Sequence, residues 1–566
     1  MDWDDINHQL SNYEWGTILG GDDPNDMLNR LLSIILAICE SRIPTKRKRT
    51  VRNSIIPKDQ KILMRRRAIL NKKLTKTTST TKKESLLSRV ATIERELKES
   101  HTKQRSKEGK QAMENIKTNP KFFYSYCKKF SKANTKIGPL QSDEGVMSST
   151  SLETCNILAK QYTKAFSQPD TTMTIPNPKE FFTNQNPNLQ LVDIQFGTTE
   201  ITQAISELSM NSAAGPDGLP AILLIKCKEV LATPLQMIWR QSLDTGIIPS
   251  VLKTAIISPI YKGGDRSQAK NYRSVALTSH LIKIFEKIIR NAIMKFMEDN
   301  GLMSNTQHGF RRGRSCLSNL LSHYEWLLQG LAGGQNVDIV YLDFSKAFDR
   351  VDHGILLHKL KAMGVTGRLG VWIHSFLTSR TQEIAVNGYR SYPTDVISGV
   401  PQGSVLGPLL FLILMGDIDQ AITHPTFISS FADDTTLSHR VKSEADVQIL
   451  QSSIKNISTW AKENNMKFNE EKFELLRCGS NQALRDSISL CTGSDQIISP
   501  SNTVKCLGVH FQKPHLSHCE KGKTDGRLGP QDFHVQGKST YAYTMDSPDT
   551  TNPRLLQAAL VTLQKR

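Results

Sequence analysis

The sequence predicts a mixed α+β fold with a basic helical region in front of it. Apolar runs of strand length, such as residues 338–342 and 426–431, alternate along the chain with longer helical patterns. Residues 41–140 instead hold 29 Lys and Arg against 7 Asp and Glu, a local charge of +22 that exceeds the +18 of the 566-residue chain. The basic character therefore belongs to one segment, and a chain of this length has room for several domains.

Three carboxylates follow two of the strand-like runs. Asp343 comes directly after residues 338–342, and Asp433 and Asp434 lie where residues 426–431 give way to a polar turn. Such oxygen ligands suit Mg²⁺, which usually binds one or two carboxylates together with substrate phosphates. Two of these ions could clamp the attacking and leaving oxygens of a phosphoryl displacement. An ordinary turn is the alternative for the Asp pair, because Asp is common in turns.

A loop rich in glycine and proline lies between these carboxylates. Residues 398–408 read Ser-Gly-Val-Pro-Gln-Gly-Ser-Val-Leu-Gly-Pro, and they lead into the apolar run 409–415. Glycine lets the backbone approach a ligand and proline stiffens it, so the pattern predicts a rigid loop that feeds a buried helix. A tight turn before a core helix, without any ligand, is the simpler alternative.

In this order, the motifs resemble the palm of reverse transcriptases from non-LTR (LINE-type, jockey-like) retrotransposons. Residues 341–349, Tyr-Leu-Asp-Phe-Ser-Lys-Ala-Phe-Asp, are similar to the first palm motif of that family, the glycine loop to the second, and Phe-Ala-Asp-Asp at 431–434 to the third. Ser274 stands where the family usually has proline, which predicts a looser turn. Segments similar to the fingers, to the stretch that follows them, to the fourth palm motif and to the primer-gripping hairpin are residues 260–266, 271–275, 307–315, 467–472 and 506–509. The resemblance covers roughly residues 1–511 and is strongest from about residue 190.

The resemblance implies a right-hand polymerase of fingers and palm that acts as an RNA-directed DNA polymerase. It implies two Mg²⁺ ions, an RNA template, a DNA primer or target and dNTPs, with no other small-molecule cofactor. The expected catalytic residues are Asp343, Asp433, Asp434 and Lys472, the last as proton donor to pyrophosphate. The expected metal site is Asp343, Phe344, Asp433 and Asp434. Nucleotide contacts are expected from Lys262, Arg273, Phe348, Gln402 and Gly403, and primer contacts from Leu507 and Gly508.

Other interpretations stay open. Each of these cations, taken alone, is more often a surface charge, and Phe348 is ordinarily a packed core ring. In the family, a ring at Phe348 would lie beneath the sugar, where it collides with a 2′-hydroxyl, which disfavours an RNA-templated RNA polymerase. A different class of function is a catalytically inactive remnant that only binds nucleic acid, because the thumb that should follow the palm is missing or aberrant.

The basic segment predicts nucleic-acid binding. Its charge suits phosphate contacts whose affinity falls with salt, and Leu86, Val90, Ile93 and Leu97 mark a helix with one apolar seam. The cations expected to bind nucleic acid are Lys46, Arg47, Lys48, Arg49, Arg65, Arg66 and Arg67. Residues 46–49 equally fit a nuclear localisation signal. The rings within 122–126 could stack bases, but core packing is favoured for most of them. A solvated basic helix without a partner is the alternative for the whole segment.

Five segments are expected along the chain. Residues 1–40 form an acidic, partly helical remnant of the linker that follows an endonuclease in the family, and the endonuclease itself is absent. The basic region spans 41–140, a polar linker 141–195, and fingers and palm 196–511. Residues 512–566 mostly lack hydrophobic periodicity, so we expect a disordered tail produced by a frameshift near residue 512.

Cysteine usage and hydropathy bear on the compartment. Nine cysteines are scattered without paired spacing, which predicts no disulfide framework and a reduced intracellular location, here nucleus and cytoplasm. Cys506, His510, His515, His518 and Cys519 straddle the expected frameshift, so we expect no zinc site from them. The apolar run 31–39 is too short to cross a bilayer and wrongly flanked for a signal peptide, so no membrane partner is expected.

Overall fold

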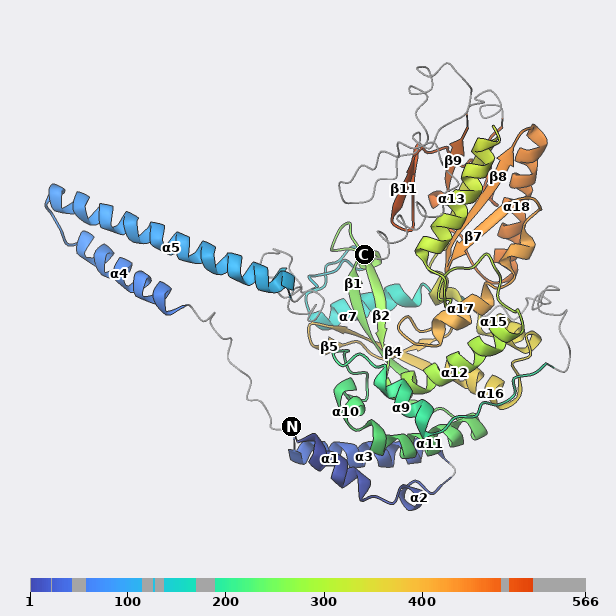
Figure 1. Cartoon of the computed structure of the whole chain (residues 1–566), viewed down its shortest axis with the longest axis horizontal. Helices are drawn as coiled ribbons and strands as arrows, with labels where there is room; N and C mark the ends of the chain where they lie inside the picture. The colour runs from blue at the N-terminus through green and yellow to red at the C-terminus, as the bar shows by residue number, and fades with distance from the viewer. Residues whose placement is uncertain are drawn as a thin grey trace, which may run out of the picture. The chain divides into compact units, whose positions relative to one another are not determined.

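A computed structural model describes residues 2–21, 23–42, 57–114, 126–127, 137–168, 189–479 and 488–512 of the chain (Figure 1). The chain divides into two compact units, one of residues 42–137 and one of residues 2–41 together with the chain from 138 onward. The expected frameshifted tail beyond Gln512 and the basic residues 46–49 lie outside the described residues. Among the described helices, none combines the length and the apolar character that crossing a membrane requires.

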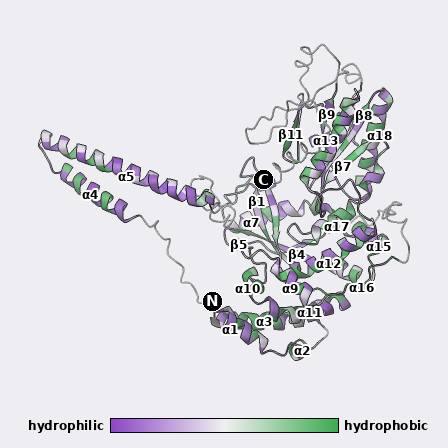
Figure 2. Cartoon of the chain, viewed as in Figure 1, coloured by the Kyte–Doolittle hydropathy of each residue, from purple (hydrophilic) through white to green (hydrophobic). Residues whose placement is uncertain are grey.

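The first unit contains a helical hairpin of α4 (Lys58–Leu74) and α5 (Thr80–Glu114). The predicted apolar seam faces α4, because Val90 and Leu97 are buried together with Leu70. Polar contacts extend the seam, since Gln60 Nε2 donates to Gln104 Oε1 at 2.9 Å. Polar residues predominate along both helices (Figure 2). The hairpin therefore has a narrow apolar interface and a broad charged surface.

The N-terminal helices of the second unit are α1 (Trp3–Ser11), α2 (Trp15–Ile18) and α3 (Pro24–Arg42). The amphipathic helix predicted around residues 28–35 is confirmed as α3, whose Leu28 and Leu31 are fully buried. Side chains of these helices belong to the same hydrophobic core as α11 (Lys228–Thr245). The acidic lead is thus packed against the main body and differs in this respect from a free linker.

Part of the segment predicted as a polar linker is folded. Residues 151–163 form helix α7 (Ser151–Thr163), capped by Thr150, whose side chain accepts from the Glu153 N–H. Helix α7 packs on β4 (Arg380–Val386) and buries Cys155, Leu158 and Ala159. The linker prediction was wrong for this stretch, because buried residues recur at helical spacing within a segment that is polar on average. Residues 169–188 of the predicted linker lie outside the described residues.

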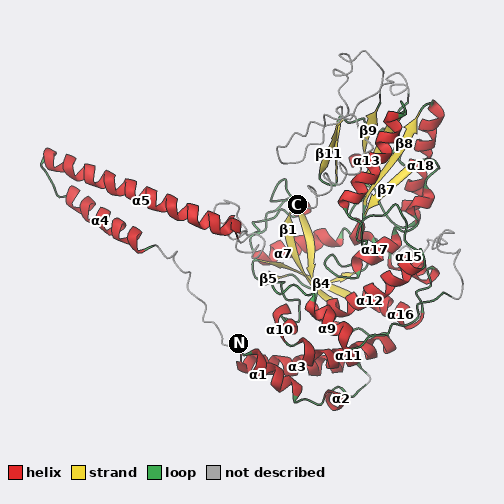
Figure 3. Ribbon diagram, in the orientation of Figure 1, coloured by secondary structure: helices red, strands yellow, loops and turns green. Residues whose placement is uncertain are grey.

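The fingers portion surrounds a five-stranded sheet (Figure 3). Its strand order is β2-β1-β4-β5, with β6 also paired to β4. The antiparallel pair β1–β2 opposes Ile260 to Arg273 and Tyr261 to Tyr272. The strands are β1 (Thr254–Tyr261), β2 (Tyr272–Leu277), β4 (Arg380–Val386), β5 (Tyr389–Arg390) and β6 (Thr394–Val396). Helices of this region are α9 (Thr198–Ser206), α10 (Ala221–Lys226), α11 and α12 (His280–Asp299).

The palm portion is built on a second, antiparallel sheet of order β7-β8-β3-β9. Its strands are β3 (Asn336–Leu342), β7 (Phe427–Phe431), β8 (Asp434–Val441) and β9 (Glu474–Cys478). Accompanying helices are α13 (Cys316–Ala332), α14 (Ala347–Arg350), α15 (His353–Ala362), α16 (Gly367–Leu377), α17 (Gly407–Leu414) and α18 (Glu444–Glu463). A separate hairpin of β10 (Thr503–Cys506) and β11 (Val509–Gln512) contacts β9. This interleaving confirms the predicted α+β class.

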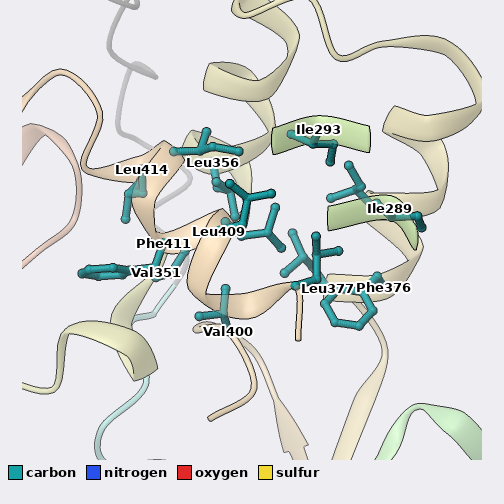
Figure 4. Close-up of a cluster of buried hydrophobic side chains, with 14 of the residues drawn as sticks. Ile289, Ile293, Val351, Leu356, Phe376, Leu377, Val400, Leu409, Phe411 and Leu414 are labelled. Atoms are coloured by element: carbon teal, nitrogen blue, oxygen red, sulfur yellow. The ribbon is translucent and has the colours of Figure 1, made fainter. Parts of the chain in front are cut away.

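The predicted buried helix after the glycine loop is confirmed as α17. Its residues from Leu409 to Leu414 are all buried. Figure 4 shows Leu409, Phe411 and Leu414 of this helix among side chains from α12, α15 and α16. A helix that is apolar on all sides packs most favourably inside the core. The loop in front of α17 is therefore anchored to a buried helix of the core.

Candidate active site

The register of the palm sheet brings the three predicted carboxylates to one end of it. Leu342, the last residue of β3, pairs with Thr435 of β8, so Asp343 and Asp434 follow and precede this pair at the same edge. Phe431 pairs with Asp434 across the β7–β8 turn, which holds Ala432 and Asp433. Ala432 has φ of +57°, a left-handed conformation that lets the turn reverse in two residues. Strand pairing thus gathers side chains that are ninety positions apart in sequence.

The carboxylates disturb one another electrostatically. Burial raises the pKa of Asp433, Asp343 raises it further, and the Arg273 guanidinium opposes the rise. The pKa of Asp434 is raised to about 6, first by desolvation and then by Asp433 and Asp343, although the residue keeps an exposed surface. Desolvated like charges of this kind favour either a proton or a bound cation. The edge of the palm sheet is therefore a site with unbalanced negative charge.

Lys472 is placed against the first of these carboxylates. Its Nζ lies 3.0 Å from Asp343 Oδ2. The backbone fixes this approach, because the Asn469 N–H donates to the Asp343 carbonyl at 2.8 Å and the Ser345 N–H donates to the Lys467 carbonyl at 2.8 Å. The Phe344 and Phe468 rings stack with centroids 4.2 Å apart. The predicted fourth palm motif is thus joined to the end of β3 by its backbone and by ring packing.

The glycine loop is clamped on two sides by backbone contacts. The Val400 N–H donates to the Phe348 carbonyl at 2.9 Å, and the Ala276 N–H donates to the Gln402 carbonyl at 2.8 Å. Gly399 has φ of +87°, and a Cβ there would lie 2.7 Å from the Asp349 carbonyl oxygen. A Cβ on Gly403 would likewise collide with the Ala276 carbonyl. Glycine is required at both positions because backbone from α14 and β2 occupies the space of a side chain.

The Glu286 carboxylate accepts two hydrogen bonds from the same loop. Glu286 of α12 accepts at Oε2 from the Val405 N–H at 2.6 Å and from the Leu406 N–H at 2.9 Å. These amides belong to the two residues directly before α17, where the N-terminal end of the helix attracts negative charge. Burial nevertheless raises the pKa of Glu286, which is fully enclosed. The loop is therefore fastened to the core at its C-terminal end.

Gln402 is oriented by Asp349, a residue that the prediction did not single out. Gln402 Nε2 donates to Asp349 Oδ1 at 2.7 Å. Because the amide nitrogen is held by the carboxylate, the carbonyl oxygen of Gln402 is the end left to face away from Asp349. Burial raises the pKa of Asp349, whereas the hydrogen bond from Gln402 and the charges of Lys346 and Arg273 oppose this rise.

The predicted nucleotide-binding cations project from the β1–β2 hairpin. Lys262 follows β1 directly, its N–H donates to the Asn271 carbonyl at 2.9 Å, and both Lys262 and Arg273 are exposed. The Arg273 charge acts on the pKa of Asp433 as well as of Asp349, so it lies within electrostatic reach of palm and loop. Phe348 is half-buried and stacks on Phe411 with ring centroids 4.3 Å apart. The packed-ring interpretation of Phe348 and a role at the surface are thus compatible.

The predicted primer-gripping residues form the turn of the β10–β11 hairpin. Cys506 pairs with Val509, and between them Leu507 and Gly508 have φ of +47° and +86°. Two consecutive positive φ values are the signature of a tight two-residue hairpin. The pKa of the Cys506 thiol is raised to about 12 by burial and then by Asp434, so Cys506, at the turn of the hairpin, lies within electrostatic reach of the carboxylates.

Of the predicted nucleic-acid-binding cations, the structure describes three. Arg65 and Arg66 are exposed on α4. Arg67 is half-buried, and its guanidinium lies 3.7 Å from Glu94 of α5. Arg65 and Arg66 are therefore the ones available to phosphates without breaking an ion pair.

The carboxylate edge has the negative charge that a divalent metal requires, but the side chains that the structure describes there are not arranged as a closed set of ligands. Within the described residues, no three acidic, His or Cys side chains already converge as a metal-binding group. Burial first, and then the charges of neighbouring carboxylates, raise the pKa values of Asp433 and Asp434, and a bound cation would relieve both effects. The residues that fit are Asp343, Asp433 and Asp434, and the Phe344 carbonyl belongs to the residue directly after Asp343.

The comparison with known proteins agrees with this arrangement. Residues 260–511 match the family model described as reverse transcriptase (RNA-dependent DNA polymerase). The chain carries a reverse transcriptase domain. Reverse transcriptases generally use divalent metal ions, a nucleic-acid template and primer, and nucleotides. The matched range contains every predicted catalytic, metal-binding and nucleotide-binding residue.

Relatives of the reverse transcriptase domain come from non-LTR retrotransposons. The chain is 28% identical over 322 residues to the RNA-directed DNA polymerase from mobile element jockey of Drosophila melanogaster, which covers 56% of this chain and 35% of that protein. It is 28% identical over 331 residues to the probable RNA-directed DNA polymerase from transposon BS of the same species, covering 56% and 36%. The chain thus spans about a third of the length of these relatives. A looser likeness, with TM-score 0.34 and 14% identity over 66% of each chain, is to the RNA-dependent RNA polymerase of a human picorbirnavirus.

Several residues that shape the reverse transcriptase site were missed by sequence reasoning. Asp349 and Gln307 lie inside segments that the motifs already marked, but a motif does not tell which of its polar side chains face each other. Glu286 carried a usable signal, since it lies at helical spacing between Ile282 and Ile289 on the buried face of α12. A charge in such a position needs a local partner, and its partners are the amides of Val405 and Leu406, directly before α17.

Proposed function

We propose that this chain is the RNA-directed DNA polymerase of a non-LTR retrotransposon, which transfers a nucleotide from a dNTP to a primer 3′-hydroxyl on an RNA template. The observation that carries the proposal is that strand register places Asp343, Asp433 and Asp434 at one edge of the palm sheet. Two further features support the proposal: the glycine loop is hydrogen-bonded to α14 and β2, and Lys472 pairs with Asp343. Matching relatives are named as RNA-directed DNA polymerases, which supports the same activity.

Each group has a role that its position suits. Asp343, Asp433 and Asp434 would hold two Mg²⁺ ions, which supply charge neutralisation and alignment to phosphoryl transfer when bound. Lys262 and Arg273 would grip the triphosphate, because both cations project from the β1–β2 hairpin. Lys472 would donate a proton to the departing pyrophosphate. Gln402 and Gly403 would contact template and nucleotide, and Leu507 and Gly508 the primer.

The helical hairpin of α4 and α5 would hold RNA through phosphate contacts. Arg65 and Arg66 are exposed there, in a segment with a net charge of +22. This feature also supports the second candidate function, a remnant that binds nucleic acid without polymerising. The two candidates differ in one measurable property, which is incorporation of dNTPs.

The deciding experiment is Mg²⁺-dependent dNTP incorporation on a primed RNA template. Asp343→Asn and Asp433→Asn each remove one charge at nearly constant volume, so incorporation should fall about a hundredfold or more. Asp495→Asn is the matched control, since Asp495 is exposed and pairs only with Lys455 at 3.5 Å among the ion pairs of the described residues. Unchanged incorporation in both site variants would reject the site, and binding of RNA without incorporation by the parent chain would favour the remnant.

A further inference from the structure

Residues 307–309, which have no role in the proposed mechanism, are hydrogen-bonded to the β7–β8 turn that holds Ala432 and Asp433. Gln307 Oε1 accepts from the Ala432 N–H at 2.9 Å and from the Gly309 N–H at 2.8 Å, and Gln307 Nε2 donates to the Ala432 carbonyl at 3.3 Å. The His308 N–H donates to the Ser430 carbonyl at 2.8 Å. A Cβ on Gly309 would collide with the Ala432 nitrogen. Residues 307–309 therefore have one position relative to Ala432 and Asp433.

The next residue, Phe310, is held in a conformation that phenylalanine rarely adopts. Its φ is +53°, and it is 52% exposed. A large side chain in the left-handed region is strained, and Gly or Asn would relieve that strain. Because about half of the Phe310 side chain is exposed, its burial contributes little free energy to offset this backbone strain. Strain without burial at a site of chemistry points to a functional reason for the ring.

The neighbour of Phe310 is Phe348, the ring that the family resemblance places beneath the sugar. Phe310 and Phe348 meet edge to face, with centroids 6.2 Å apart and planes at 87°. Phe348 also stacks on the buried Phe411. The three rings form a row that leads from the core at Phe411 to the surface at Phe310. Phe310 is thus the outermost ring, beside the turn that carries Asp433.

We propose that Phe310 is a specificity-determining residue that contacts the sugar of the incoming nucleotide and forms one wall with Phe348. The inference rests on the proposed polymerase function and deepens it. An aromatic edge and face present a surface without hydrogen-bond partners, so a deoxyribose carbon packs there and a 2′-hydroxyl loses its hydration without replacement. Phe310 also blocks Phe348 from turning outward, which keeps the wall closed. Gln307 and Gly309 act as positioning residues for it.

The test uses the full chain and separates ring chemistry from folding. Phe310→Asn and Phe310→Gly remove the ring and suit the left-handed backbone, so the midpoint of unfolding should not fall. Preference for dATP over ATP, measured as the ratio of kcat/KM on the same primed template, should fall about three- to tenfold, the scale of one aromatic contact. Phe310→Tyr should keep the preference. Val371→Asn is the control, because Val371 is also an exposed apolar residue (56%) and lies on α16.

A second measurement tests whether the two rings form one wall. In a Phe348→Ala background, Phe310→Asn should change the dATP preference less than it does in the parent chain, because contacting residues are not additive. Unchanged preference in Phe310→Asn and Phe310→Gly, with a discriminating parent chain, overturns the inference alone. A lowered midpoint with unchanged preference overturns it as well, since the ring is then structural. A parent chain that incorporates neither nucleotide defeats the proposed function, and the inference with it.

Discussion

Lys472 and Asp343 form an ion pair at the edge of the palm sheet, with 3.0 Å between Nζ and Oδ2. The two residues come from segments joined by backbone hydrogen bonds, since Asn469 donates to the Asp343 carbonyl. Asp343 is also the first residue proposed to hold Mg²⁺. A divalent ion that binds Asp343 must therefore share or displace the lysine ammonium, and displacement frees that ammonium for the phosphates of the nucleotide.

This competition predicts opposite effects of one substitution on metal binding and on turnover. Lys472→Gln should tighten Mn²⁺ binding, measured by electron paramagnetic resonance without nucleotide, by up to about fivefold, because exposed ion pairs contribute at most about 1 kcal/mol. The same variant should incorporate dNTPs more slowly, since the proposed proton donor is lost. Lys455→Gln, at another exposed pair, should do neither. Weaker Mn²⁺ binding in Lys472→Gln would contradict the competition.

Asp349 predicts a nucleotide effect that depends on hydrogen bonding and not on charge. Asp349→Leu removes the acceptor of Gln402 Nε2, so the amide loses its fixed orientation and KM for dNTP should rise about tenfold. Asp349→Asn keeps an oxygen acceptor and should stay within about twofold of the parent chain. Steady-state kinetics with dNTP as the varied substrate distinguishes the two. Asp395→Leu, at an exposed position on β6, serves as control. Equal damage from Asn and Leu would show that the charge of Asp349 is what matters.

The carboxylate edge could be predicted because its signals are local. Asp343 and Asp433 each follow an apolar run of strand length. These runs form β3 and β7, which both pair antiparallel with β8 and therefore end at the same edge of the sheet. The partners Asp349 and Gln402 could not be paired from sequence, because 53 residues separate them and the contact depends on how the glycine loop meets α14. Long-range side-chain contacts of this kind follow from packing that only the folded backbone defines.

Helix α7 illustrates the opposite failure. Its buried face includes Thr154 and Cys155, and the segments beside it are rich in Ser, Thr, Asn and Pro, so composition favoured a linker. The signal that was available is the cap, since Thr150 followed three positions later by Glu153 is typical of a helix start. Local capping rules were therefore more informative here than mean polarity.

Arg65 and Arg66 predict the salt dependence of RNA binding. Each exposed guanidinium that meets a phosphate releases about 0.7 to 0.9 counterions, so neutralising both should lower the slope of log K against log salt by about 1.5. The measurement is binding of the full chain to RNA between about 50 and 200 mM salt. Arg65→Gln with Arg66→Gln is compared with Lys295→Gln with Lys455→Gln, two exposed lysines of the other unit. If both double variants gave the same slope of log K against log salt, α4 would not belong to the RNA-binding surface.

His323 predicts a loss of stability in mild acid. It lies on α13, is 3% exposed, and contacts the rings of Tyr341, Phe427 and Phe511. Neither ring nitrogen has a hydrogen-bond partner among the described residues, and burial lowers the pKa of the imidazole to about 4. The folded state therefore holds His323 neutral, whereas the unfolded chain binds a proton below about pH 6.5.

A lowered histidine pKa destabilises the fold as pH falls from about 6.5 towards 4, because only the unfolded state gains the proton. His323→Phe removes this group and keeps a ring in an aromatic site. We expect the variant to gain about 2 kcal/mol over the parent chain in free energy of unfolding between pH 7.5 and pH 5, measured by urea denaturation. His8→Phe, at an exposed position on α1, should show no such gain. A pH-independent difference between His323→Phe and the parent chain would mean that the imidazole is protonated in the fold, and that a partner for it exists among residues packed on α13.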